Sequence, residues 1–245
     1  FLDAGLGVVY SVIDRTFYLI VRTSNAMARQ SHTRDRLVQT AGELFWRQGY
    51  ARTGVSEIMK RARATSGSFY HFFPTKDDLL LAVLEEVRRR VEDEILGHVE
   101  SVSPDPGVRV SALAQAYRTH TVPDAMDYGL PVGALISELD RDLDDAGRRI
   151  AMIYEIFFER VDGWFDSQET RPVAAAGERG LAELIVGGLE GAALVALASR
   201  SAGAIDACAR QLVFHVNTIV ANGGTADELP PPPTADGEIG DWKAW

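Results

Sequence analysis

The stretch that decides the fold of this 245-residue chain reads Thr53-Gly54-Val55-Ser56-Glu57-Ile58 and continues to Gly67-Ser68-Phe69-Tyr70-His71-Phe72-Phe73-Pro74-Thr75-Lys76-Asp77-Asp78-Leu79. Its spacing predicts a short helix over 55–61, a turn at 62–64, and a second short helix that is capped by Thr65 or Ser66 and runs to about Tyr70. Pro74 closes this part, and Thr75 opens a longer helix through a capping box with Asp78. Two short crossed helices present one of them to the major groove of DNA.

Basic residues gather around this stretch, although the whole chain carries a net charge of −10. Between Met27 and Lys76, nine Lys or Arg residues stand against three acidic ones, which gives the segment a net charge of +6. Residues 1–26 are neutral, so residues 77–245 carry −16. A basic run alone favours a solvated surface without a partner. Together with the helix-turn-helix spacing, it favours DNA as a partner.

The rest of the sequence predicts an all-α protein, because no stretch alternates with the period of a strand over a useful length. A helix follows Thr33, and Gly49 suits its end. Further helices are expected over 109–120, 131–143, 147–164, 178–200 and 202–221. The chain then divides into an N-terminal segment at 1–26, a three-helix domain at 27–75, a second helical domain at 76–222, and a flexible Pro-rich tail at 223–245.

Residues 1–26 have the features neither of a signal peptide nor of a membrane span. Acidic and basic residues interrupt the apolar run 6–21, and no basic region precedes it. Ser24-Asn25-Ala26 before Met27 is typical of the remnant of a cleaved tag. We therefore interpret 1–26 as a leader, a tag or a mis-assigned upstream segment, and we expect a cytoplasmic protein without a membrane partner.

Chemistry-bearing residues form no catalytic or metal-binding set in this sequence. The single cysteine, Cys208, excludes an internal disulfide and a cysteine-based zinc site. The five histidines lack metal-ligand spacing. The acidic cluster within 140–145 lacks the glycine and the ligand spacing of a calcium loop. We therefore expect no enzyme activity, no cofactor and no metal.

The N-terminal part closely resembles the TetR/AcrR family of bacterial transcriptional regulators. The residues that carry this resemblance are Thr33-Arg34, Ala41, Leu44-Phe45, Gly49-Tyr50, Val55, Glu57-Ile58, Gly67 to Phe72, Lys76 and Leu79. A weaker resemblance to the C-terminal domain of the LmrA/YxaF-like branch rests on residues 128–139 and on Leu189-Glu190-Gly191-Ala192. The resemblance implies a tetracycline-repressor-like fold in which 27–75 bind DNA and 76–222 bind an effector and form the dimer.

Several residues of the first domain suit contact with DNA. Ser66 and Ser68 carry short hydroxyls that can meet base edges. Gly67 permits a close approach, either to the duplex or to a neighbouring helix. Lys76 lies in the first turn of a helix, where a cation opposes the helix dipole unless a phosphate is near. With the phosphate contacts that the resemblance implies, the expected DNA-binding residues are Arg34, Thr53, Arg63, Thr65, Ser66, Ser68, Tyr70, His71 and Lys76.

Three positions depart from the family's pattern. Gly54 stands where members usually have Thr or Ser, so the helix that follows loses a capping hydroxyl. Arg63 stands where the turn usually carries glycine, and a side chain there strains a left-handed turn while adding a charge that can face DNA. Leu130 replaces a usual cysteine of the branch. These departures put individual contacts in doubt, but not the motif.

The acidic domain combines aromatic and methionine residues with a pair of small-residue helices. Most such aromatic residues fill cores, but a subset can line an apolar pocket, which the resemblance places in this domain. The expected lining residues are Tyr117, Met126, Tyr128, Tyr154 and Phe158. Small residues permit close helix approach, and a helix pair from each subunit would form a four-helix dimer interface, with burial inside one chain as the alternative. The expected interface residues are Leu184, Gly188, Gly191, Leu212 and Val216.

We therefore predict a homodimeric regulator, most simply a repressor, that releases operator DNA when a small apolar effector binds. Two alternatives belong to other classes. One is a small-molecule-binding enzyme or carrier with a vestigial helix-turn-helix, and the absence of a catalytic set in the sequence speaks against an enzyme. The other is a structural DNA-binding protein without an effector, which ligand-dependent thermal shifts would distinguish.

Overall fold

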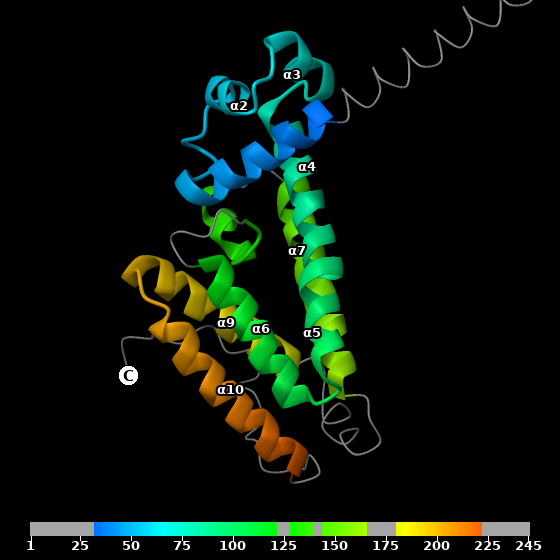
Figure 1. The fold of residues 1–245 in the computed structure, drawn as a ribbon, viewed down its shortest axis with the longest axis vertical. Helices are drawn as coiled ribbons and strands as arrows, with labels where there is room; N and C mark the ends of the chain where they lie inside the picture. The colour runs from blue at the N-terminus through cyan, green and yellow to red at the C-terminus, as the bar shows by residue number, and fades with distance from the viewer. Residues whose placement is uncertain (1–31, 122–127, 140–143, 166–179, 222–245) are drawn as a thin grey trace, which may run out of the picture.

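The computed structural model describes residues 32–121, 128–139, 144–165 and 180–221, and all regular elements in these ranges are helical (Figure 1). The all-α prediction is therefore confirmed for this part of the chain. The first helix, over residues 32–48, ends at Gly49 as expected. Gly49 has a positive φ of 91°, and its backbone N–H donates a hydrogen bond to Phe45 O. It is followed by α2 (Val55–Arg61), α3 (Ser66–Phe72) and α4 (Lys76–Arg89).

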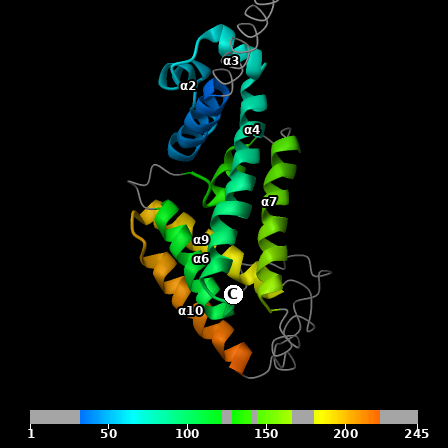
Figure 2. The same ribbon diagram turned by 45° about the vertical axis from the view of Figure 1, so that its right-hand side comes forward.

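α4 leads from the small N-terminal bundle into the larger second part (Figures 1 and 2). Its start is the predicted capping box, in which Thr75 accepts from the Asp78 amide while the Asp78 side chain accepts from Thr75 N. A buried apolar stripe follows, formed by Leu79, Leu80, Val83, Leu84 and Val87. The helix continues through a π-helical stretch, Arg90–Leu96, into α5 (Gly97–Val102).

The second part packs further helices around the lower end of α4 and α5. α7 lies along one side of α4, while α6, α9 and α10 lie together (Figure 2). The core includes Tyr117 of α6, Ile150, Ile153 and Phe157 of α7, and Ile185 and Leu189 of α9, all completely or almost completely buried. The bounds are α6 (Pro106–Thr121), α7 (Asp144–Asp162), a 3-10 turn (Gly163–Phe165), α9 (Gly180–Ser199) and α10 (Gly203–Ala221).

The helix predicted over 131–143 differs in the structure. The chain forms a 3-10 helix over Val132–Glu138 after a cis Leu130–Pro131 bond, and residues 140–143 lie outside the described residues. Gly133 and Pro131 are poor helix formers, and the side chain of Glu190 accepts the first two amides of the segment. Tertiary hydrogen bonds thus determine the conformation here, which helical periodicity does not predict.

Candidate nucleic-acid interface

The helix-turn-helix forms where the sequence places it. Gly54 precedes α2; its backbone is extended and it provides no side-chain cap, as expected for glycine at this position. Thr65 precedes α3, and its hydroxyl accepts from the Ser68 amide at 3.2 Å, so Thr65 is the cap. The Thr65 and Ser68 hydroxyls also share a hydrogen bond of 2.9 Å. The hydroxyls of Thr65 and Ser68, both expected at DNA, therefore help to build the N-terminal end of α3.

One face of α3 packs on the first domain and the other is open. Phe69 is completely buried. Around it Ser66, Gly67 and His71 are exposed, and Tyr70 is 55% exposed. An exposed aromatic side chain beside hydroxyls and an imidazole gives this face hydrogen-bond donors and stacking area at one place. The face has the chemistry needed to meet phosphates and base edges.

Gly67 leaves a space that no residue of the described chain fills. A Cβ built at this position meets no atom within 4 Å. The alternative that glycine serves close approach to a neighbouring helix is therefore excluded for the described residues. The α3 backbone at Gly67 is therefore open for the close approach of an external partner.

Arg63 adopts the left-handed conformation that the turn requires. Its φ is 51°, a region that costs a non-glycine residue about 1–2 kcal/mol. The side chain is exposed. The turn is also held from the first helix, because Arg36 Nε donates to Ala62 O at 3.2 Å. Arg36 was not among the expected site residues, although its basic side chain contributes to the charge of the segment.

Thr53 lies inside the domain and not on its surface, contrary to its expected role at DNA. It is only 1% exposed, and its hydroxyl donates to Gly49 O at 2.7 Å. Gln48 Nε2 donates to both Thr53 Oγ1 and Glu57 Oε2. The hydroxyl therefore anchors the loop between the first helix and α2, and this internal demand replaces the phosphate contact.

Two predicted cations already contact aromatic rings. The Arg34 guanidinium lies 5.6 Å from the centroid of Phe73, and Arg34 is exposed. The Lys76 ammonium lies 4.0 Å from the centroid of Tyr50 and donates to Tyr50 O at 2.6 Å. Lys76 is half-buried, so it fixes the start of α4 against the loop at Tyr50. A phosphate contact by Lys76 stays a prediction.

The second domain contains a buried carboxylate that the sequence reading missed. Glu190 on α9 is 7% exposed. Its Oε1 accepts from Tyr117 OH at 2.8 Å and from Val132 N at 3.0 Å, and its Oε2 accepts from Tyr154 OH at 2.9 Å and from Gly133 N at 3.0 Å. All four donors come from other elements. Such complete pairing is what permits a carboxylate in a core.

The two tyrosines at Glu190 stay protonated and can donate. Burial, followed by the charge of Glu190, raises the pKa of both Tyr117 and Tyr154 well above the usual value. Leu189-Glu190-Gly191-Ala192 carried a resemblance, but a lone Glu in an apolar helix gave no sign of its partners. Only the fold brings residues 117, 132, 133 and 154 to it.

The expected pocket residues that the structure describes, Tyr117, Tyr128, Tyr154 and Phe158, lie in different surroundings. Tyr117 is fully buried at Glu190, and Phe158 stacks on Tyr154 with centroids 6.2 Å apart. Tyr128 contacts the first domain, and Met126 lies outside the described residues. One cavity of about 380 Å³ lies between α4 and α7, with Leu81, Leu84 and Met152 among its walls. Another of about 430 Å³ lies between the first helix and α4 and includes Tyr128.

The expected interface residues fall into two groups. Leu212 and Val216 of α10 are buried within the chain, 6% and 0% exposed, and a Cβ at Gly188 would meet Cys208 Sγ at 3.3 Å. These three close the contact of α9 with α10 inside one chain, which corrects their assignment to the dimer. Leu184 is 49% exposed, and Gly191 faces open space.

α9 is apolar on its outer face as well as its inner face. Among the described residues it is the helix long and apolar enough to cross a membrane by length and composition, but Glu190 in its middle is fully paired with groups of the same fold. Its packing is therefore that of a core helix with one uncovered side. The exposed apolar residues of this side are Leu184, Leu194, Val195 and Leu197.

Residues 37–83 match the family model described as "Bacterial regulatory proteins, tetR family". The chain is 32% identical over 113 residues to the uncharacterized HTH-type transcriptional regulator YxaF of Bacillus subtilis (strain 168), covering 46% of this chain and 59% of that protein. It is 30% identical over 107 residues to LmrA of the same organism, covering 43% and 56%. The matched stretch thus spans somewhat over half the length of these relatives.

The fold extends the likeness beyond the matched residues. A TetR transcriptional regulator from Chloroflexus aurantiacus superposes with a TM-score of 0.65 over 78% of this chain and 96% of that chain, at 21% identity. The helix-turn-helix and the fold are thus both similar to those of transcriptional regulators of this family. The helix-turn-helix unit belongs to the TetR family, and the described remainder shares the fold of a solved member.

Proposed function

We propose that this protein is a cytoplasmic transcriptional repressor that binds operator DNA as a homodimer and releases it when a small apolar effector binds. Residues 27–75 form the DNA-binding part, and residues 76–222 the effector-binding and dimerisation part. The observation that carries the proposal is the open face of α3, where Gly67 leaves its backbone uncovered beside exposed Ser66 and Tyr70. The net charge of +6 on residues 27–76 supplies attraction to phosphates.

In this proposal α3 enters the major groove. Ser66 faces bases, while Tyr70, His71 and Arg63 hold the backbone on either side. A dimer places two such helices about 34–36 Å apart, one helical turn of DNA, and so reads a pseudo-palindromic operator. The left-handed turn at Arg63 sets the angle between α2 and α3, and its exposed guanidinium adds one phosphate contact.

The outer face of α9 is the surface proposed for the dimer. Leu184, Gly191 and Val195 recur at helical spacing on its exposed side. A helix that is apolar all round is normally covered on all sides. A second copy of the same face covers it with closed two-fold symmetry, which is the commonest arrangement of soluble homo-oligomers.

The effector is proposed to bind between α4 and α7. The cavity there, about 380 Å³, lies within the size range of small-molecule sites. Its walls combine apolar side chains with charged ones: Leu81, Leu84 and Met152 with Glu85, Arg88, Asp145, Arg148 and Arg149. α4 begins directly after the DNA-binding part and borders this cavity, so a ligand that changes the position of α4 relative to α7 also moves α3. Operator must then lower effector affinity by the same factor by which effector lowers operator affinity.

The function is tested in two steps with the full chain. Duplexes selected from random DNA by the immobilised protein give a candidate operator, and fluorescence anisotropy measures its affinity against a scrambled duplex. Thermal shifts with a panel of apolar compounds then identify an effector, which is titrated with and without operator. Equal affinity for both duplexes would refute the DNA-binding proposal. Equal effector affinity in both titrations would refute the switch.

A further inference from the structure

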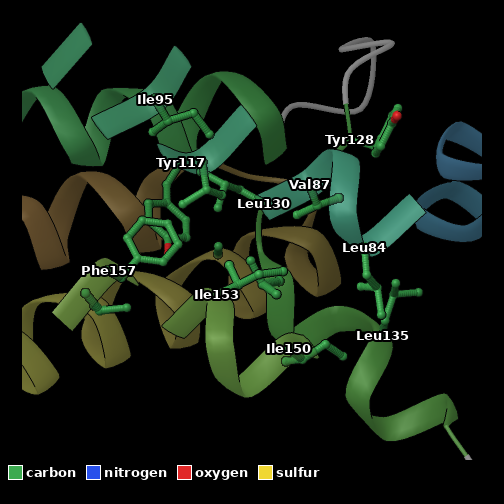
Figure 3. Close-up of a cluster of buried hydrophobic side chains, with 14 of the residues drawn as sticks. Leu84, Val87, Ile95, Tyr117, Tyr128, Leu130, Leu135, Ile150, Ile153 and Phe157 are labelled. Carbon is green, nitrogen blue, oxygen red and sulfur yellow. The ribbon is translucent and has the colours of Figure 1, made fainter. Parts of the chain in front are cut away.

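The segment 128–133 contacts the DNA-binding part at one end and Glu190 at the other. Tyr128 lies against the first helix, whereas Val132 and Gly133 donate their amides to Glu190 on α9. Within this segment the side chains of Leu130 and Val132 are buried in the core of the second domain. Figure 3 shows Tyr128 directed towards the first helix, with Leu130 near Val87 and Tyr117. Six residues therefore connect α9 with the first helix.

The Tyr128 end is tightly held. A Cβ on Gly42 would lie 2.4 Å from two atoms of the Tyr128 ring, so the ring rests directly on the backbone of the first helix. The Trp46 ring lies beside it, with centroids 5.8 Å apart. From the other side Arg90 Nη1 donates to Tyr128 O at 2.8 Å, and its guanidinium lies 4.9 Å from the ring centroid. The Tyr128 ring is thus held against Gly42, Trp46 and Arg90, and it also borders the cavity between the first helix and α4.

The Glu190 end is equally determined. Each carboxylate oxygen accepts one tyrosine hydroxyl and one backbone amide. A Cβ at position 133 would lie 2.9 Å from Tyr154 OH, so a side chain there would displace that hydroxyl. Any displacement of α9 relative to α6 and α7 breaks these bonds or carries Val132 and Gly133 along. Glu190 is one turn from Leu194, on the helix that carries the exposed apolar face.

The contact continues from the first helix to the helix-turn-helix. Tyr128 rests on Gly42 and Trp46, and the same helix carries Arg36, whose Nε holds Ala62 O in the turn before α3. The chain of contacts therefore runs from α9 through residues 128–133 to the orientation of α3. It also contacts the helix that joins the two parts along the backbone, because Arg90, directly after α4, donates to Tyr128 O.

We propose that Glu190 and Tyr128 are positioning residues for operator binding, coupling α9 to α3 through the segment 128–133. The proposal rests on the proposed DNA-binding function. It assigns to Glu190 a role beyond filling the core. The carboxylate fixes the positions of Val132 and Gly133, and thereby the packing of the Tyr128 ring against the first helix. Changes at α9 reach α3 by this route.

Two substitutions break the connection at opposite ends. Glu190→Gln keeps the shape but leaves only one oxygen acceptor, so either Val132 or Gly133 loses its partner. Gly42→Ala favours the first helix by propensity but drives its methyl into the Tyr128 ring. Gly147→Ala on α7 is the matched control, since a Cβ there meets nothing within 4 Å. The double variant Glu190→Gln/Gly42→Ala tests whether the two ends act in one route.

Amide hydrogen exchange of the full chain without DNA gives the first readout. We expect faster exchange at Val132 or Gly133 in Glu190→Gln, and faster exchange in 62–72 in both variants, by about tenfold or more. Gly147→Ala should match the parent. Unchanged exchange at Val132 and Gly133 in Glu190→Gln, or opening there without any change in 62–72, overturns the proposal. Because no DNA is present, this result does not depend on the proposed function.

Operator affinity gives the second readout. Each single variant should weaken operator binding by about fivefold or more, within the usual range of coupling between sites. The operator affinity of the double variant should be no lower than that of the single variant with the lower affinity, because a connection that is broken at one end transmits nothing. Additive losses would show two independent effects and overturn the single route. A parent that binds no duplex selectively would refute the proposed function and leave the exchange result standing.

Discussion

Lys76 and Tyr50 hold each other at the junction between the first helix and α4. The Lys76 ammonium lies 4.0 Å from the Tyr50 ring centroid and donates to the Tyr50 carbonyl oxygen at 2.6 Å. The Tyr50 hydroxyl in turn donates to Asp77, the next residue of α4. Burial, and then this hydrogen bond, raise the pKa of Tyr50 well above its usual value, so the hydroxyl remains a donor. A residue expected only at phosphates thus also tethers the domain.

Lys76→Ala should therefore lower thermal stability as well as DNA affinity. Loss of the cation–π contact and of a charge-assisted hydrogen bond is worth about 1–3 kcal/mol, and the melting temperature should fall by several degrees. If Lys76 also meets a phosphate, the slope of log affinity against log salt decreases by about 0.9. Differential scanning fluorimetry checks the first effect. An unchanged melting temperature would contradict the tether.

Arg63→Gly should stabilise the protein and weaken DNA binding at the same time. Glycine adopts φ 51° without the cost that arginine bears, and relief of about 1 kcal/mol is partly offset by the entropy of glycine in the unfolded chain. Arg63→Ala removes the same charge without relieving the backbone. Urea unfolding should rank Gly above Ala, whereas both variants should bind operator equally weakly. Equal stability of the two variants would refute the strain.

Val195→Glu should convert a dimer into a monomer. Val195 is 55% exposed on the outer face of α9, and a charge there is buried without a partner when two copies meet. Leu212→Glu is a different experiment: Leu212 is 6% exposed inside the chain, so that variant should unfold instead of dissociate. Sedimentation at micromolar concentration distinguishes them. A monomeric parent, or a folded dimer of Val195→Glu, would refute the proposed interface.

The stabilising contribution of Glu100 should be lost in acid. The hydrogen bond from Arg160 lowers the pKa of Glu100, so its contribution is present above the unfolded value of about 4.3 and is lost as pH falls below that value. The melting temperature of the parent should exceed that of Glu100→Gln at pH 6, and the difference should shrink towards pH 3. Glu159→Gln, exposed on α7, controls for removal of one charge. A difference that is constant with pH would contradict this account.

Local signals predicted much of the fold, because their physical causes are local. Thr75 and Asp78 form their capping box, Gly49 ends the first helix, and the turn at Arg63 is left-handed. Buried Phe69 on the inner side of α3 follows from helical periodicity. Each of these depends on residues within a few positions of one another, so one sequence suffices to predict them.

The sequence failed where distant residues decide. Glu190 receives donors from positions 36 to 73 residues away, and nothing in its neighbourhood marks them. Thr53 was expected at a phosphate, but its hydroxyl donates to Gly49 O and accepts from Gln48 Nε2 inside the domain. Leu212 and Val216 on α10, like Leu184 on α9, belong to apolar faces at helical spacing. Periodicity does not tell whether such a face packs within the same chain or against a second copy.

The central claim is that DNA covers the open face of α3, and Gly67→Leu tests it most directly. A side chain at position 67 meets nothing in the described chain, and leucine favours the helix, so the melting temperature should stay the same or rise. The leucine nevertheless stands between α3 and the groove. Fluorescence anisotropy with the selected operator should show affinity reduced by about tenfold or more, at unchanged melting temperature. Full operator affinity in Gly67→Leu would contradict the account, because the surface around Gly67 would then not face DNA.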